Sequence, residues 1–191
     1  AYHAREIFED PAFPLAVRKG IHGTDVAAHT HDFLELVLVA GGSARHSLSF
    51  ADRPAVAASH LLVEGDVFVV APGERHTYSE SQGLTIYNVL FQPALVAGAR
   101  DELRPIRGIA GVLLLEPLFR SETGFRHKLH LAAAVQRTVR HCLDTIAEEM
   151  ARKPSGWRVL ARARFLECLV LLGRSFEAQH AQPNNEKQLT G

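Results

Sequence analysis

The chain contains few cysteines, and methionine and tryptophan are rarer still. Its 191 residues include two cysteines, one methionine and one tryptophan. Cys142 and Cys168 form no CxxC pair, and both lie in segments with helical periodicity. This excludes a cysteine-rich disulfide scaffold, and we expect two buried, reduced thiols.

Long apolar runs are also missing. No run reaches the roughly 18 residues that predict a membrane-spanning helix, and residues 1–6 lack the basic and hydrophobic regions of a signal peptide. The 21 basic and 21 acidic side chains balance, so the overall charge does not favour a nucleic-acid or membrane surface. We therefore expect a protein of the cytoplasm with no membrane partner.

The balanced charge conceals a difference between two parts of the chain. Residues 1–119 carry nine basic and fourteen acidic side chains, a net of −5, whereas residues 120–174 carry eleven and five, a net of +6. Because runs of charge usually form solvated or paired faces, we expect ion pairs between the two parts.

Short strands dominate the chain up to about residue 92. Alternating or apolar segments of a few residues are separated by turn residues such as Gly41-Gly42-Ser43 and Pro72-Gly73. Many short strands at such spacings are typical of a sandwich or a barrel. We place a barrel at residues 21–124, with Val112–Leu115 as one further strand.

Residues 1–20 predict an arm outside this barrel. Pro11 and Pro14 flank Phe13, and proline neither donates a backbone hydrogen bond nor continues a helix. We expect an extended segment that lies over another part of the protein.

After Gly124 the periodicity becomes helical. Apolar residues from Leu129 to Met150 recur at spacings of three and four, and Lys153-Pro154-Ser155-Gly156 ends this pattern. A second helix, from about Trp157 to Ala178, is apolar over most of its circumference and so needs cover on more than one side.

Residues 125–180 therefore predict two antiparallel helices that form a dimerisation region, with an entirely intramolecular core as the alternative. Residues 181–191 have the composition of a linker. The residues expected at the homodimer interface are Leu129, Val139, Leu143, Ile146, Leu169, Leu172 and Phe176.

The most informative segment is His29-Thr30-His31-Asp32-Phe33-Leu34-Glu35. In a β-strand, residues two apart share a face, so the two histidines and Glu35 project to one side. His76 follows the turn at Gly73 on a later strand. Polar groups at inward positions must be satisfied by a metal, a polar ligand or one another.

Neutral imidazole and carboxylate suit a divalent first-row ion. We therefore expect His29, His31, Glu35 and His76 to be ligands of Zn, Ni, Mn or Fe. The alternative is a polar lining that binds an effector or water without a metal. The other histidines, His46 and His60 among them, have no converging spacing and are expected to be surface or ordinary polar residues.

These residues resemble the cupin superfamily. Its first motif, G-x5-H-x-H-x3-E-x6-G, is matched at every spacing by Gly23, His29, His31, Glu35 and Gly42. The resemblance covers about residues 21–92 and implies a small antiparallel cupin barrel (a double-stranded β-helix or jelly roll).

The second cupin motif is matched only in part. Gly65, Gly73 and His76 fit it, but Ala71 stands at its proline position and Glu80 replaces its asparagine. These departures lower the expectation of a bound metal.

Other segments resemble the N-terminal sensor and dimerisation domain of AraC-type transcriptional activators, most closely the regulators of rhamnose operons. The resemblance rests on Pro11-Ala12-Phe13-Pro14, His29–Val37, Glu64–Phe68 and His76-Thr77-Tyr78. It implies a small effector inside the barrel, an arm that closes over it, and helices that pair two subunits. DNA would be contacted only by a domain beyond the linker, which is absent from this chain.

The resemblance makes Phe13 the expected lid residue. Phe33 and Tyr78 are candidates for stacking on a sugar ring, and Asn88 and Arg45 for binding hydroxyl or carboxylate groups. The leading hypothesis is thus an effector-sensing, dimerising module that binds a sugar or sugar acid. A metal-dependent cupin dioxygenase, isomerase or epimerase is the alternative, and a purely structural dimerisation domain is a third reading.

Overall fold

Two long paired strands form the frame of the protein. The computed structural model describes residues 1–22, 25–50, 53–115 and 128–181. In it, β3 (Leu34–Phe50) and β6 (Arg75–Phe91) pair antiparallel from the Leu34–Phe91 pair to the Ser49–Arg75 pair. The sheet has the order β1-β6-β3-β5-β7, with β2 added to β6 and β4 to β3.

The remaining strands are shorter than β3 and β6, and two of the helices are long. The other strands are β1 (Leu15–His22), β2 (Val26–His29), β4 (Arg53–Val63), β5 (Asp66–Val70) and β7 (Leu129–His130). The helical elements are α1 (Ala4–Ile7), η1 (Pro93–Ala99), α2 (Arg100–Leu103), α3 (Arg107–Ala110), η2 (Gly111–Leu115), α5 (Ala133–Arg152) and α6 (Trp157–His180).

A bend in β3 and β6 turns the sheet into a barrel. The pairing of the two strands shifts between Val39 and Arg45. Gly42 lies there with φ +72°, and a Cβ on it would stand 2.3 Å from the carbonyl oxygen of Gly83. Only glycine allows the two backbones to approach this closely in that conformation.

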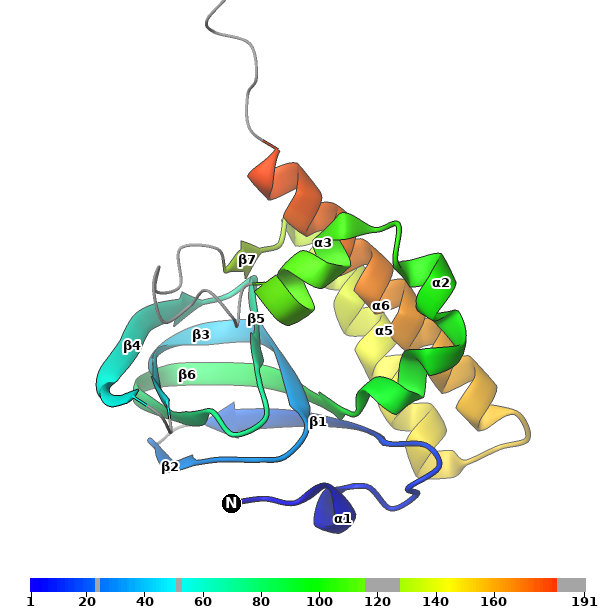
Figure 1. The fold of residues 1–191 in the computed structure, drawn as a ribbon, viewed down its shortest axis with the longest axis horizontal. Helices are drawn as coiled ribbons and strands as arrows, with labels where there is room; N and C mark the ends of the chain where they lie inside the picture. The colour runs from blue at the N-terminus through cyan, green and yellow to red at the C-terminus, as the bar shows by residue number, and fades with distance from the viewer. Residues whose placement is uncertain (23–24, 51–52, 116–127, 182–191) are drawn as a thin grey trace, which may run out of the picture.

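The bend also exchanges the faces of β3. Before it, Val37 and Val39 face the barrel interior, and after it Ala44 and Leu48 do so. The opposite face of the first half of β3, with Leu36 among its residues, packs against the helices. One wall of the barrel therefore separates an interior core from a second core between that wall and the helices, and α5 and α6 lie side by side along one side of the barrel (Figure 1).

The architecture confirms the predicted fold class, which is mainly β with two C-terminal helices. The predicted helix stop at residues 153–156 lies between α5 and α6. Both cysteines are buried and free, as expected. Among the described helices, none has the length and apolar character that crossing a membrane requires.

The expected ion pairs between the acidic and basic parts are present. Lys153 contacts Glu9 at 2.7 Å, and Lys128 contacts the buried Asp66 at 2.7 Å. Arg158 also pairs with Asp10. The opposite net charges of the two parts therefore serve partly to join them.

Three local predictions were wrong. The second half of the expected arm is a barrel strand, because Leu15–His22 pairs with β6 along its whole length. Val112–Leu115 lies in a π-helical turn. Leu129 belongs to β7, opposite Val67, because α5 begins only at Ala133.

Some expectations concern residues outside the described part of the chain. They include Gly23 of the first motif, the barrel boundary at residue 124, the start of the helical region at 125–127, and residues 182–191 of the expected linker.

Candidate functional site

Neighbouring strands bring the predicted metal ligands together. His29, the last residue of β2, lies directly opposite His76 in β6, and their ring centroids are 4.2 Å apart. Glu35 comes from the start of β3. Potential ligand atoms of these three side chains all lie within 4.8 Å of one another.

His31 joins the cluster through the carboxylate. Its Nε2 lies 3.1 Å from Oε2 of Glu35, and Nε2 of His76 lies 3.7 Å from the same oxygen. His31, Glu35 and His76 are buried, whereas His29 is half-buried. The cluster is therefore a buried carboxylate surrounded by three imidazoles.

The segment that supplies these residues is not a single strand, contrary to the prediction. β2 ends at His29 and β3 starts at Leu34, and His31 lies between them in an isolated bridge to Tyr2. Two backbone hydrogen bonds hold this break, from Tyr2 N to the Thr30 oxygen and from Gly73 N to the His31 oxygen, both 2.8 Å.

Backbone carbonyls fix the tautomers of two histidines. Nδ1 of His31 lies 2.7 Å from the Phe33 oxygen, and Nδ1 of His29 lies 2.9 Å from the Ala27 oxygen. A carbonyl only accepts, so each Nδ1 carries a proton and donates it. In the neutral rings the lone pair is then on Nε2, which for His31 faces the carboxylate.

Two lone-pair-bearing atoms at 3.1 Å need a proton or a cation between them. The donor set of imidazole and carboxylate, with histidines anchored by outer hydrogen bonds, is typical of a divalent metal site. The residues present therefore fit a metal ion, and in its place a proton on His31 gives an ion pair.

The pKa of Glu35 is lowered from its ordinary value. Burial alone raises it, but the hydrogen bond with His31 and the electrostatic interactions with His76, His31 and His29 outweigh burial. The carboxylate therefore carries its negative charge inside the barrel, as a metal ligand must.

The predicted effector contacts divide into two groups. Phe33 stacks on His31 with centroids 4.6 Å apart, and Tyr78 lies 5.9 Å from His76. Asn88 pairs with Val37 of the interior face, and its buried Oδ1 has no hydrogen-bond partner. Phe33 and Tyr78 therefore adjoin the cluster, and Asn88 lies on the same interior face of the barrel as Val37.

Arg45 and Phe13 lie elsewhere. Arg45 is exposed and pairs with Glu80 at 3.1 Å, because the bend in β3 turns odd-numbered residues outward after Gly42. Phe13 is buried in the core under the helices, with its ring 5.1 Å from that of Trp157. It is thus not a lid over the histidine cluster.

His46 lies beside the cluster, although its spacing predicted a surface or ordinary polar residue. It is fully buried, and its Nε2 lies 3.4 Å from Nδ1 of His76. A signal was present, because His46 alternates with Ala44 and Leu48 in a strand pattern, and both neighbours are interior residues.

The N-terminal arm, which in the structure is residues 1–14 before β1, contacts the cluster at one end. The backbone N–H of Ala4 donates to Oδ1 of Asp32 at 2.6 Å, and the Tyr2 ring lies 5.2 Å from that of His29. Phe8 packs edge-on against Phe33 at 5.6 Å.

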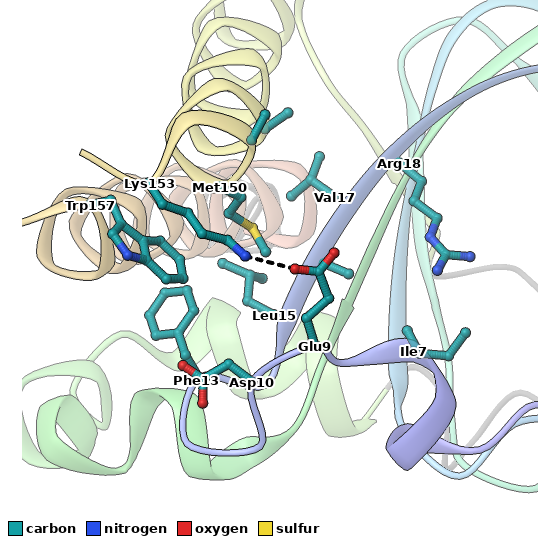
Figure 2. A pocket seen from close by; sticks show the side chains of 13 residues that line it. Ile7, Glu9, Asp10, Phe13, Leu15, Val17, Arg18, Met150, Lys153 and Trp157 are labelled. Atoms are coloured by element: carbon teal, nitrogen blue, oxygen red, sulfur yellow. Dashed lines mark hydrogen bonds and ion pairs between the residues drawn. The ribbon is translucent and has the colours of Figure 1, made fainter.

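At its other end the arm contacts the helices, where a cavity of about 230 Å³ lies between it, β1 and the α5–α6 turn. Figure 2 shows Phe13 beside Trp157 and Lys153 extending to Glu9. The arm therefore connects the histidine cluster with the helical pair.

The residues expected at the dimer interface are already covered within one chain. The buried members pack in the core shared by the sheet and the helices, and only Phe176 is half-buried. The narrow apolar stripe of α5 thus faces the barrel, and a dimer needs another face. The buried members are Leu129, Val139, Leu143, Ile146, Leu169 and Leu172.

Comparisons with known proteins agree with this architecture. A model of the AraC-like ligand binding domain matches residues 15–169. The transcriptional activator RhaR of Cronobacter sakazakii is 29% identical over 88% of this chain and 53% of its own length. RhaS of Klebsiella pneumoniae is 25% identical over 97% of this chain and 60% of its own length.

The chain thus spans a little over half the length of these curated relatives. Among solved structures, a cupin-2 domain protein from Shewanella frigidimarina is a distant likeness, with 18% identity, a TM-score of 0.33, and coverage of 41% of this chain and 71% of that one. Because the family model covers the histidine cluster, α5 and half of α6, the chain belongs to the family of AraC-like ligand-binding domains.

Proposed function

We propose that this chain is the effector-sensing and dimerisation module of a cytoplasmic transcription regulator. Its effector is a small polar molecule, a sugar or sugar acid, bound in the barrel at the histidine cluster. The observation that carries the proposal is the convergence of His29, His31, Glu35 and His76 where the arm contacts the barrel. Buried polar groups need polar partners, and a polar ligand supplies them.

The same four residues are proposed to hold a divalent ion of zinc, nickel, manganese or iron. When bound, such an ion offers an open coordination position to an oxygen of the effector. The chain itself fixes the imidazole orientations through the Ala27 and Phe33 carbonyls and supplies the charge of Glu35.

The relatives favour a regulator over a metal-dependent enzyme. RhaR and RhaS, which match most of this chain, are transcriptional activators. Since those relatives extend well beyond the matched region, we propose that DNA is contacted by a domain outside this sequence.

The arm gives the proposed sensor a physical output. It contacts His29 of the cluster and the neighbouring Asp32, and at its other end it contacts Lys153 and Trp157 of the helical pair. An effector that binds the arm-docked conformation more tightly shifts the population toward that conformation. The helical pair, and whatever follows it, then senses whether the barrel is occupied.

Acid is expected to release the arm from the helices. The pKa of Glu9 is lowered by its hydrogen bond and charge interaction with Lys153, and that of Asp10 by hydrogen bonds from Arg158 and the Ala12 backbone. The two ionised carboxylates stabilise the docked arm fully at pH values above their ordinary pKa values of 4.5 and 3.8. This stabilisation is lost as the pH falls through their lowered pKa values in the folded protein. The contact between the arm and the helices should therefore weaken below about pH 4.

Trp157 reports this release, because it is the sole tryptophan and packs against Phe13. We expect its fluorescence to change between pH 6 and pH 3 before the circular dichroism of the fold does. The double variant Glu9→Gln, Asp10→Asn is the control and should show the released signal at neutral pH. An acid transition of the same size in this variant would contradict the assignment.

The proposed homodimer uses the outer face of α6. Val159, Ala163, Leu166 and Val170 recur at helical spacings. Val159 is 71% exposed, Ala163 is exposed, and the other two are half-buried. A second copy of the chain, packed helix against helix, would cover this stripe.

A charge in the stripe should separate the subunits. We expect Val159→Glu to weaken dimerisation by roughly 10- to 100-fold, because it places a carboxylate in an apolar contact, while the fold is unchanged. Analytical ultracentrifugation measures the effect. Arg137→Glu, at an exposed position of α5 away from the stripe, controls for charge, and a monomeric wild-type chain would refute the dimer.

The proposed function is tested by titrating the purified chain with a panel of neutral sugars, sugar acids and divalent metals by isothermal calorimetry. Binding that His31→Ala abolishes, and that Arg45→Ala leaves unchanged, is the expected result. Absence of binding to every sugar and sugar acid would contradict the sensor assignment, and metal-dependent turnover of a small molecule would favour the enzyme instead.

A further inference from the structure

We propose that His46 is a positioning residue of the candidate metal site, and that it orients His76 and selects its tautomer. This inference rests on the metal site of the proposed function. His46 lies on the interior face of β3, opposite Tyr78 of β6, and is 0% exposed. Its Nε2 is 3.4 Å from Nδ1 of His76.

The two nitrogens of His76 face different groups. Nδ1 faces His46, whereas Nε2 lies 3.7 Å from the Glu35 carboxylate. A metal-binding imidazole must present a lone pair, so its other nitrogen must carry the proton and donate it. His46 Nε2 is an acceptor at the position where this proton is directed.

Each of the three histidines of the cluster is then oriented by a hydrogen bond donated from its Nδ1, and the acceptors differ. His29 and His31 donate Nδ1–H to backbone carbonyls of the residues near them in the chain. For His76 the corresponding atom is a side-chain nitrogen from the adjacent strand. The third anchor is therefore the one that a single substitution can remove.

The rings around His46 limit its rotation. Its centroid lies 4.6 Å from that of Phe68, 4.9 Å from that of Tyr78 and 5.2 Å from that of His60. All four side chains occupy the interior of the barrel, where close packing leaves few rotamers. A fixed acceptor of this kind holds the ring plane of His76 toward Glu35.

Packing alone does not require a histidine here. The neighbouring interior residues include Ala44, Leu48 and Phe68, and a phenylalanine has a volume similar to that of histidine without two nitrogens to desolvate. His46→Phe therefore separates the two roles: it keeps the packing and removes the acceptor.

The test compares metal binding by the wild-type chain, His46→Phe and His46→Gln, with Co²⁺ and Zn²⁺ as probes. We expect His46→Phe to lose 10- to 100-fold in Zn²⁺ affinity, the usual range for an outer hydrogen-bond partner, and to change the visible absorption of bound Co²⁺. The melting temperature of the metal-free protein should not fall. His46→Gln, whose amide oxygen accepts a hydrogen bond, should regain most of the lost affinity.

Leu84→Ala is the matched control, because it opens a cavity in the same interior core and leaves His46 and the rings packed on it in place. It should lower the melting temperature and leave the Co²⁺ spectrum unchanged. If His46→Phe binds both metals like the wild type, or if Leu84→Ala loses equal affinity, the positioning role is refuted while the metal site stands. If the wild-type chain binds neither metal, the metal site itself fails, and His46 loses its role with it.

Discussion

Replacing Glu35 by glutamine should lower the affinity for a divalent metal by roughly 100-fold or more, a loss larger than that expected for an outer-shell change. Glu35 is 4% exposed and lies within 3.7 Å of two imidazole nitrogens. Hydrogen bonding and the nearby histidines lower its pKa despite burial, so it supplies the negative charge of the site. A neutral amide of the same shape removes that charge and leaves the volume unchanged.

The measurement is metal affinity by chelator competition, together with the rise in melting temperature that a saturating metal produces. Glu80→Gln is the matched control, because this carboxylate is exposed and pairs with Arg45 on the outside of the barrel. It should leave both quantities unchanged. Metal affinity retained in Glu35→Gln would mean that the carboxylate is not a ligand.

The sequence predicted the members of the cluster but not the backbone that carries them. Two-residue spacing in one strand placed His29, His31 and Glu35 on a common face. In the structure the strand is interrupted, and His31 reaches Glu35 from a bend held by Tyr2 and Gly73. Contacts between segments distant in sequence decide such a bend, and local periodicity contains no information about them.

The bend of β3 explains the errors at Arg45 and His46. Strict alternation establishes that these neighbours face opposite sides. Which side is the interior depends on the register shift around Gly42 and on its close approach to Gly83. A single-residue change in that register would exchange the two side chains, so the sequence alone did not show that Arg45 is exposed and His46 is buried.

The apolar pattern of the helices predicted burial correctly, and the structure shows the intramolecular core that was the alternative to a dimer interface. Val139, Leu143 and Ile146 are buried, but against the barrel wall and α6. Amphipathic periodicity predicts how wide the apolar face of a helix is. It does not predict whether that face packs against the same chain or against a second copy of it.

Truncation of Phe165 to alanine should destabilise the protein by about 3–5 kcal/mol, the usual cost of removing a buried phenylalanine. Phe165 of α6 is 0% exposed, and its ring packs 4.9 Å from that of Phe91 in β6. The core around it contains residues of the sheet and of both long helices. The lost contacts therefore weaken the junction between barrel and helices as well as α6 itself.

Urea denaturation followed by circular dichroism and by Trp157 fluorescence measures this loss. Because one core joins the two parts, both signals should change in a single transition at a lower urea concentration. Val159→Ala, at a 71% exposed position of the same helix, should change the free energy of unfolding by less than about 0.5 kcal/mol in the monomer. A Phe165→Ala protein in which the two signals separate would show that the helices fold independently of the barrel. The arm would then be the chief connection between the histidine cluster and the helical pair.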